Sequence, residues 1–176
     1  MMQKLSMDQL ERMQPEDFRK SQKLPVVVVL DNVRSMHNVG SIFRTADAFL
    51  LEAIYLCGYT PRPPHRDIQK TALGATETVT WKAYDTIQEA IGFLKESNYQ
   101  LIAAEQTEGS ISLQQIAVEK GEKLAIIFGN EVEGVQQEVI DQCHACIEIP
   151  QLGTKHSLNV SVAAGIVLWK LVEKYL

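Results

Sequence analysis

The stretch Pro25-Val26-Val27-Val28-Val29-Leu30-Asp31-Asn32 decides the fold class of this 176-residue chain. Its continuous run of β-branched and apolar residues predicts a strand that is buried on both faces, because a strand with one exposed face would alternate apolar and polar residues. Buried strands of this kind are typical of parallel sheets. The stretch therefore indicates a sheet covered by helices on both sides.

Strand-like and helical segments alternate on either side of this stretch. Further apolar or β-branched runs predict strands at residues 53–57, 78–81, 99–104, 124–128 and 146–149. Apolar residues at helical spacing predict helices at residues 37–51, 68–73, 86–94 and 160–175, the last with the strongest amphipathic pattern. This alternation predicts an α/β fold with a mostly parallel sheet, which binds ligands beyond the carboxyl ends of its strands.

The length of the chain fits one compact domain. We expect residues 23–176 to form this single α/β domain. Residues 1–22 are expected to form an N-terminal helical hairpin, because Ser6 and Gln9 have the spacing of a capping box and Pro15 can begin a second helical turn. The proline-rich segment Gly58–Asp67 is the longest irregular stretch, and such loops are usually functional.

The charge balance is uneven along the chain. The net charge of −5 argues against a generic nucleic-acid-binding protein, which usually carries a basic excess. However, residues 1–70 have a net charge of +2 and contain all six arginines, whereas residues 71–176 have a net charge of −7. Arginine suits bidentate phosphate contacts, so the first part is the expected face for an anionic partner. Simple drift in arginine and lysine usage on a solvated surface is the alternative.

Several classes of protein are disfavoured by what the sequence lacks. It has no apolar run of membrane-spanning length and no apolar core of a secretory signal, so a cytoplasmic protein without membrane contact is expected. Neither common glycine-rich nucleotide signature occurs. Cys143 and Cys146 have the spacing of a metal motif, but Cys57 is the only other thiol, so we expect reduced cysteines and no metal site.

Three expected strand ends carry glycine and small polar residues. The first segment is Asn38–Arg44, in which Asn38 can cap a helix and Arg44 lies off the apolar stripe. The second is Phe128–Gly134, which places Glu131 at the ligand edge of the sheet. The third is Ile149–Asn159, which delivers two polar residues to the start of the last helix. Taken singly, these patterns also fit an arginine paired with Asp47, an ordinary turn and a helix cap.

In order and spacing, the three segments resemble the three motifs of the SpoU/TrmH family of RNA ribose 2′-O-methyltransferases, in the SPOUT superfamily. The resemblance runs from about Pro25 to Tyr175. It implies a deep trefoil knot in the C-terminal part of the sheet, a homodimer, and S-adenosylmethionine as cofactor. The implied reaction is in-line attack of an RNA ribose 2′-hydroxyl on the sulfonium methyl group, without a metal.

The resemblance also implies roles for particular residues. Those matching the family's catalytic and supporting positions are Arg44, Asn38, Glu131, Ser157 and Asn159. Those matching its cofactor contacts are Thr107, Gly129, Ile149 and Leu158. Residues expected to contact RNA are Arg34, His37, Arg62, Arg66 and Lys70. In this scheme Arg44 assists deprotonation of the hydroxyl or clamps phosphate, and Glu131 orients Arg44 electrostatically.

The sequence departs from the family pattern at two positions. Val132 stands where many members have glycine, and Gln151 replaces the methionine that frequently follows Ile-Pro. We expect neither the extra N-terminal RNA-binding domain of many ribosomal-RNA members nor the basic C-terminal extension of the tRNA guanosine enzymes. Transfer RNA is the favoured substrate over ribosomal RNA. A non-catalytic RNA- or cofactor-binding module and a small-molecule α/β enzyme remain the alternative functions.

Overall fold

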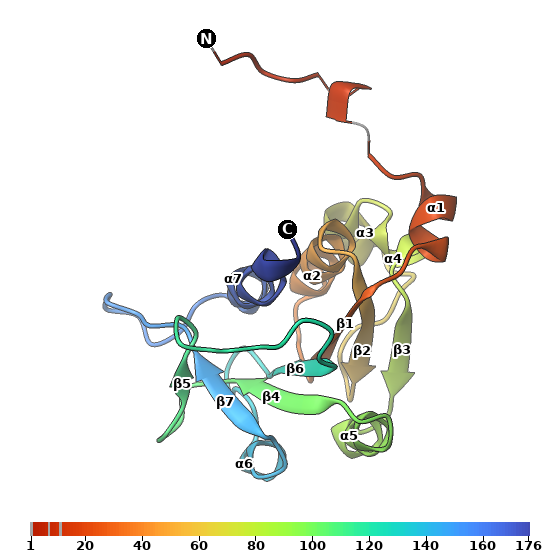
Figure 1. The fold of residues 1–176 in the computed structure, drawn as a ribbon. Helices are drawn as coiled ribbons and strands as arrows, with labels where there is room; N and C mark the ends of the chain where they lie inside the picture. Colours follow the sequence, from red (N-terminus) through yellow and green to blue (C-terminus); the bar gives the residue numbers. More distant parts are fainter. Residues whose placement is uncertain (1, 7, 11) are drawn as a thin grey trace.

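The computed structural model describes residues 2–6, 8–10 and 12–176. Its centre is a seven-stranded sheet with the order β3-β2-β1-β6-β4-β7-β5 (Figure 1). The strands are β1 (Leu24–Asp31), β2 (Leu51–Cys57), β3 (Trp81–Tyr84), β4 (Gln100–Ala104), β5 (Ile111–Ser112), β6 (Leu124–Phe128) and β7 (Ala145–Glu148). Every neighbouring pair is parallel, which confirms the predicted fold class.

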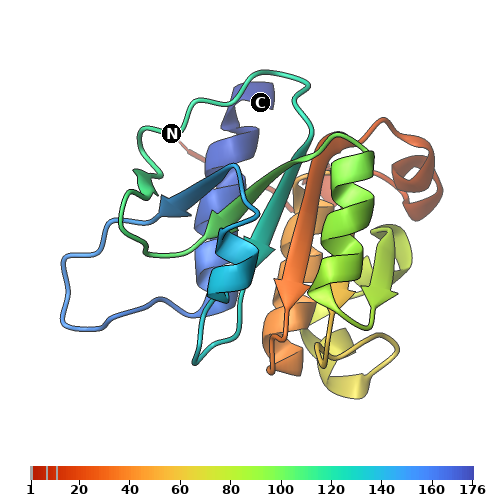
Figure 2. The same ribbon diagram turned by 90° about the horizontal axis from the view of Figure 1, so that it is seen from below.

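Helices cover both faces of the sheet (Figures 1 and 2). They are α1 (Pro15–Lys20), α2 (Met36–Ala48), α3 (Arg66–Ala72), α4 (Ala75–Thr78), α5 (Ile87–Glu96), α6 (Gln137–Ile140) and α7 (Val160–Val172), with 3₁₀ turns η1 (Asp8–Leu10) and η2 (Glu173–Tyr175). One buried cluster joins α2, α3 and α7 to the sheet, and a second joins α5 and α6 to the other face.

Strand β1 shows why the opening stretch decides the fold. It lies between β2 and β6, and Val28 is aligned with Ile54 on one side and Ile126 on the other. Val28 belongs to the cluster under α2 and α7, whereas its neighbour Val27 belongs to the cluster under α5. Both side chains are fully buried, so each face of β1 is covered by helices.

One expected strand was misplaced, and two short elements were not predicted. The strand expected at residues 78–81 is β3, which begins only at Trp81, because Ala75–Thr78 is the short helix α4. The Thr78 hydroxyl donates to the carboxylate of Asp47, which holds α4 against α2. The short elements β5 and α6 were not predicted, since two and four residues are too few for a periodic pattern.

The last helix was also wrongly described as the most amphipathic. Helix α7 is apolar on nearly all sides: Ala164 and Leu168 are buried, but Val162, Ile166 and Trp169 are exposed by 51%, 39% and 50%. Trp169 packs its ring against that of Phe49, with the ring centroids 5.9 Å apart. An apolar stripe of α7 thus remains uncovered.

The N-terminal segment contains two short helical pieces, η1 and α1. Figure 1 shows η1 well away from α1, and Phe18 of α1 is buried in the main core. The Ser6 backbone N–H donates to Oε1 of Gln9 at 2.8 Å, as the capping-box spacing predicts. The hairpin and the domain boundary after residue 22 remain predictions.

Candidate functional site

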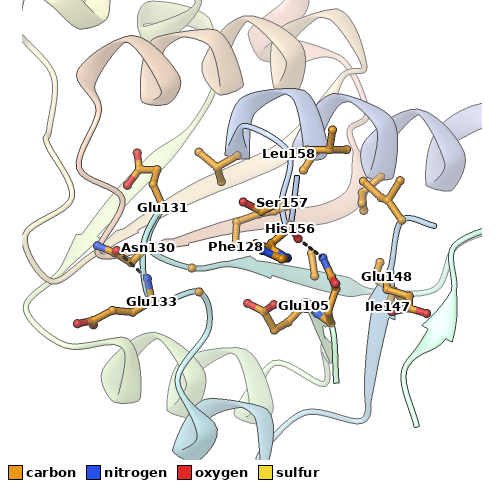
Figure 3. A pocket seen from close by; sticks show the side chains of 18 of the residues that line it. Glu105, Phe128, Asn130, Glu131, Glu133, Ile147, Glu148, His156, Ser157 and Leu158 are labelled. Atoms are coloured by element: carbon orange, nitrogen blue, oxygen red, sulfur yellow. Dashed lines mark hydrogen bonds between the residues drawn. The ribbon is translucent and has the colours of Figure 1, made fainter. Parts of the chain in front are cut away.

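The carboxyl ends of β4, β6 and β7 and the start of α7 enclose a cavity of about 360 Å³ (Figure 3). Phe128, Ile149 and Leu158 supply apolar walls, whereas Glu105, Glu133 and Glu148 supply carboxylates. All strands are parallel, so these ends meet at the edge where a ligand is expected. We call this space the strand-end cavity.

The turn after β6 forms one wall of the strand-end cavity and depends on two glycines. A Cβ at Gly129 would lie 2.1 Å from the carbonyl oxygen of Gly134, so no side chain fits there. Gly134 has a φ of +70°, which favours glycine. Glu105 braces the same turn, because its Oε2 accepts from the backbone N–H of Val135 at 2.9 Å.

A chain of hydrogen bonds joins the three motif segments. The Asn38 side-chain amide donates to Oε1 of Glu131 at 3.0 Å. The Asn159 amide donates to Oδ1 of Asn38 at 3.1 Å. Asn38 is only 9% exposed, so both ends of its amide are satisfied within the protein. Three residues far apart in the sequence are therefore held in one network beside the cavity.

Glu131 carries a charge that several donors stabilise. Its two carboxylate oxygens accept from the backbone N–H groups of Arg34 at 2.8 Å and Ser35 at 3.0 Å. Burial alone would raise the pKa of Glu131, but these hydrogen bonds, its own backbone N–H and the Asn38 amide together outweigh burial and lower that pKa. The ionised Glu131 carboxylate thus fixes the backbone just before α2 through hydrogen bonds.

Asn159 has a second task as the cap of α7. Its Oδ1 accepts from the backbone N–H of Ser161 at 2.9 Å and from the Ser161 hydroxyl at 2.6 Å. The alternative interpretation of Asn159 as a helix cap is therefore correct, and it is compatible with the network. The same side chain fixes the helix start and holds Asn38.

Asn38 itself does not cap α2, contrary to the prediction. Ser35 is the capping residue, and its hydroxyl accepts from the backbone N–H of Asn38 at 3.3 Å. Because Ser35 satisfies that orphan donor, the Asn38 side chain is free to bridge Glu131 and Asn159.

Arg44 lies exposed on α2. Within the described part of the chain its guanidinium has neither an ion-pair partner nor a hydrogen-bond acceptor. The alternative pairing with Asp47 is not found, because Asp47 accepts from Thr78. Glu131 bonds other donors and makes no direct contact of this kind with Arg44.

The residues matched to cofactor contacts are mostly brought together. Gly129, Ile149 and Leu158 line the strand-end cavity, as do the supporting residues Glu131 and Ser157. Thr107 does not line it, and its carbonyl accepts from Ser110 at 3.1 Å.

Gln106, the residue before Thr107, takes part in the cavity instead. Its side-chain amide donates to the carbonyl oxygen of His156 at 2.8 Å, as Figure 3 shows. This bond ties the end of β4 to the loop before α7, so the loop closes one side of the cavity.

The residues expected to contact RNA are all exposed but differ in their partners. Arg62 pairs with Asp85 at 3.4 Å, and Lys70 pairs with Asp67 at 2.7 Å. Such surface pairs contribute little and exchange readily for other anions. Arg34, His37 and Arg66 form no ion pair in the described residues. Arg34 is bonded directly to the network, because its backbone N–H donates to Glu131.

Sequence reasoning missed two functional candidates, Asn130 and Ser161. Asn130 is buried, and its Oδ1 accepts from the backbone N–H groups of Val132 at 2.8 Å and Glu133 at 3.2 Å. Both residues lie inside the family motifs, so the motifs could have pointed to them. The spacing of the motif residues, however, does not predict where their side chains point.

The cysteines show no sign of ligand chemistry. Burial raises the pKa of Cys57 to about 12 and that of Cys143 to about 11, so both are thiols near neutral pH. No group of three or more histidine, cysteine or acidic side chains suited to a metal ion occurs in residues 2–6, 8–10 and 12–176. None of the described helices has the length and hydropathy needed to cross a bilayer.

The sheet is parallel throughout, and the loops after its strands enclose a cavity. These two features define an α/β protein that binds its ligand at the carboxyl ends of the strands. The sequence model of the SpoU rRNA Methylase family matches residues 25–169. The chain belongs to this SpoU/TrmH family.

Individual relatives agree with this assignment. A Staphylococcus haemolyticus protein named for the TrmH family of tRNA/rRNA methyltransferases is 32% identical over 163 residues, which are 90% of this chain and 64% of the relative. The chain thus spans less than two thirds of that relative.

Two solved structures are similar in fold and sequence. The AdoMet-bound rRNA methyltransferase from Sinorhizobium meliloti has a TM-score of 0.82 at 28% identity, covering 90% of this chain and 60% of that one. The A. aeolicus TrmH/SpoU tRNA modifying enzyme has a TM-score of 0.78 at 28% identity, covering 91% and 79%. These neighbours imply the SPOUT knot for the C-terminal part of the sheet.

Proposed function

We propose that this protein is an S-adenosylmethionine-dependent RNA methyltransferase that methylates a ribose 2′-hydroxyl. The observation that carries the proposal is the Glu131–Asn38–Asn159 network, which joins the three family motifs beside the strand-end cavity.

The strand-end cavity suits the proposed cofactor chemically. Its apolar walls at Ile149 and Leu158 fit a purine ring, and its carboxylates at Glu133 and Glu148 fit the positive charges of a sulfonium and an ammonium group. Gly129 also lines the cavity, and the Gly134 backbone packs where its side chain would otherwise be. When bound, the cofactor supplies a methyl group already activated for transfer. The AdoMet-bound Sinorhizobium meliloti structure supports this choice.

The residues of this chain supply mainly alignment. Alignment of two reactants contributes roughly 7–11 kcal/mol to a rate enhancement. In this proposal the Arg44 guanidinium binds the phosphate beside the target ribose and stabilises charge that develops on the 2′-oxygen. Asn38 positions the α2 segment that carries Arg44, while Ser157 lies at the cavity wall, where it holds the substrate or shapes the pocket.

Transfer RNA is the favoured substrate, with ribosomal RNA as the alternative. In support, the A. aeolicus TrmH/SpoU tRNA modifying enzyme is similar to this chain at 28% identity. His37, Arg62, Arg66 and Lys70 are proposed as further RNA contacts, because they are exposed on α2, on α3 and in the loop between β2 and α3.

A homodimer is part of the proposal. The exposed stripe of α7 formed by Val162, Ile166 and Trp169 is an apolar surface that water solvates poorly. A second copy of the chain would cover it.

The test is transfer of a radiolabelled methyl group to RNA from a strain lacking the gene, with Arg44→Lys as the variant. We expect transfer to fall by about 10²-fold or more, as for loss of a preorganised charge-stabilising group. Cofactor affinity, measured by calorimetry, should stay nearly unchanged because Arg44 does not line the cavity. The exposed Arg12→Lys is the matched control.

Two results would contradict the proposal. Equal single-turnover rates for Arg44→Lys and the unaltered protein would remove Arg44 from the site. Binding of mononucleotides in place of S-adenosylmethionine would favour a small-molecule enzyme. Nucleoside mass spectrometry of the deletion strain should reveal one lost 2′-O-methyl nucleoside, whose RNA decides between tRNA and rRNA.

A further inference from the structure

Tyr59, in the loop after β2, is an exposed aromatic residue that no role so far explains. Its side chain is 61% exposed. An aromatic ring at this exposure is usually mobile or unimportant, unless its surroundings fix it. The contacts of Tyr59 decide between these cases.

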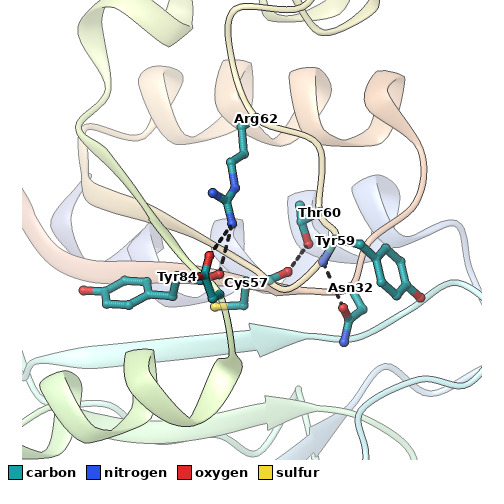
Figure 4. Close-up of polar contacts among 7 residues, drawn as sticks. Asn32, Cys57, Tyr59, Thr60, Arg62 and Tyr84 are labelled. Atoms are coloured by element: carbon teal, nitrogen blue, oxygen red, sulfur yellow. Dashed lines mark hydrogen bonds and ion pairs between the residues drawn. The ribbon is translucent and has the colours of Figure 1, made fainter.

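Hydrogen bonds of Tyr59 and of the next residue, Thr60, hold the ring in place. Its hydroxyl accepts from the Asn130 side-chain amide at 2.6 Å, and its backbone N–H donates to Oδ1 of Asn32 at 3.2 Å. The next residue, Thr60, is buried; its hydroxyl donates to the Cys57 carbonyl at 2.8 Å and accepts from the N–H of Val33 at 3.1 Å. Figure 4 shows the bonds around Asn32 and Thr60. The ring is therefore held rigid while its face stays open.

The Tyr59 ring lines a second cavity of about 470 Å³, together with Arg34, Asn130, Val132 and Glu133. The last three of these also line the strand-end cavity, so one turn separates the two spaces. We call the second space the Tyr59 cavity. A ligand that spans the turn would reach both cavities at once.

The chemistry of the Tyr59 cavity fits a nucleobase. A fixed aromatic face offers stacking at a low entropic cost. Val132 is 76% exposed and adds a second apolar surface, at the position where many family members have glycine. The free guanidinium of Arg34 supplies a phosphate contact at the rim. Arg62, by contrast, lies on the other side of the loop beside Tyr84 (Figure 4).

We propose that Tyr59 is a specificity-determining residue that stacks on the base of the nucleotide to be methylated, or of its immediate neighbour. This inference rests on the proposed function, because it takes the strand-end cavity as the cofactor site. A base inside a duplex cannot present its face, so the proposal requires an unpaired nucleotide in a loop or at an end.

The experiment compares Tyr59→Leu with Tyr59→Phe. Leucine removes the ring, whereas phenylalanine keeps the ring and removes only the bond to Asn130. Unfractionated RNA from a strain lacking the gene is titrated in the methyl-transfer assay and, without cofactor, in filter binding. Base stacking on an aromatic ring predicts that Tyr59→Leu raises KM and Kd for RNA about tenfold. Tyr59→Phe should change both by less than about threefold, and neither variant should change cofactor affinity.

Two outcomes would overturn the inference. One is unchanged RNA affinity in Tyr59→Leu. The other is equal impairment of both variants, which would assign the effect to the Asn130 bond and the loop structure. If the unaltered protein binds RNA but transfers no methyl group, the proposed function fails while the filter-binding contrast still tests Tyr59.

Discussion

Asn38 is the residue on which the candidate site depends, because a single buried amide satisfies donors and acceptors from two other motifs. An amide is suited to this task since it donates at one end and accepts at the other. Aspartate would present two acceptors, and its charge would be repelled by Glu131. The polar residues of the motifs are thus explained in part by structure alone, before any ligand binds.

The charge of Glu131 gives a pH prediction. Its pKa in the folded protein lies below the ordinary value of 4.5, so its contribution to stability is present above that value and is lost as pH falls through the folded pKa. We expect Glu131→Gln to lower the free energy of unfolding at neutral pH by about 1–3 kcal/mol, because charged acceptors form the stronger hydrogen bonds.

This difference should shrink as the pH falls below the ordinary carboxyl value of 4.5 and through the lowered folded-state pKa of Glu131. Urea unfolding at several pH values measures it. Glu133→Gln is the control in the same turn, since the Glu133 carboxylate accepts no hydrogen bond from the described residues. A constant difference at all pH values would show that the carboxylate charge is not what stabilises the site.

At the scale of elements, the contact between α2 and α3 is unusually close. A Cβ at Gly40 of α2 would lie 2.1 Å from the Thr71 hydroxyl and 2.3 Å from the Ile68 carbonyl of α3. The glycine of the first motif therefore serves helix packing, and through it the position of Asn38 and Arg44.

Gly40→Ala should consequently destabilise the protein by about 1–3 kcal/mol, since overpacking forces backbone shifts. Gly92→Ala in α5 is the matched control, because nothing lies within 4 Å of its added Cβ. That control should gain about 0.5–1 kcal/mol from helix propensity. Denaturant midpoints at unchanged m-values compare the two variants; similar stabilities would refute the packing role.

The sequence was sufficient to predict the elements whose apolar residues are buried in the core. β1, β4 and β6 are continuous apolar runs, and Thr86 caps α5 as its spacing predicts. The sequence was insufficient where a contact with a residue far away in the chain determines the local structure. The last residue of α4, Thr78, is bonded to Asp47 of another helix. Ser35 caps α2 in place of Asn38, whose side chain is bonded to Glu131 and Asn159.

The candidate site was predictable to the same extent. Of the site residues predicted from the motifs, Gly129, Glu131, Ile149, Ser157 and Leu158 line the strand-end cavity, whereas Thr107 does not. Strand ends and motif spacing could not identify Gln106 or Asn130, because the direction of a side chain in a loop depends on contacts with distant segments.

For the whole molecule, the uncovered face of α7 makes a prediction about assembly. A charge at its centre would be buried without a partner in a dimer, so Ile166→Glu should yield monomers. Light scattering and sedimentation measure the change. Leu73→Glu, at an exposed position at the end of α3, should leave the assembly unchanged. Persistence of dimers in Ile166→Glu would move the interface elsewhere.

The charge distribution acts at the same scale. For the proposed RNA substrate, a net charge of −5 predicts weak general attraction that depends strongly on salt. We then expect recognition to depend on the shape of the RNA and on particular contacts.

The bond between Asn159 and Asn38 spans 121 residues of sequence. During synthesis, β1 and α2 emerge early, but the amide of Asn38 stays without its second partner until α7 has left the ribosome and docked. A chain that ends before α7 therefore leaves the Asn38 side-chain carbonyl oxygen without its Asn159 donor, and burying that unpaired group would cost free energy. We expect ligand binding in the strand-end cavity only after α7 has docked, because residues at the start of α7 line that cavity.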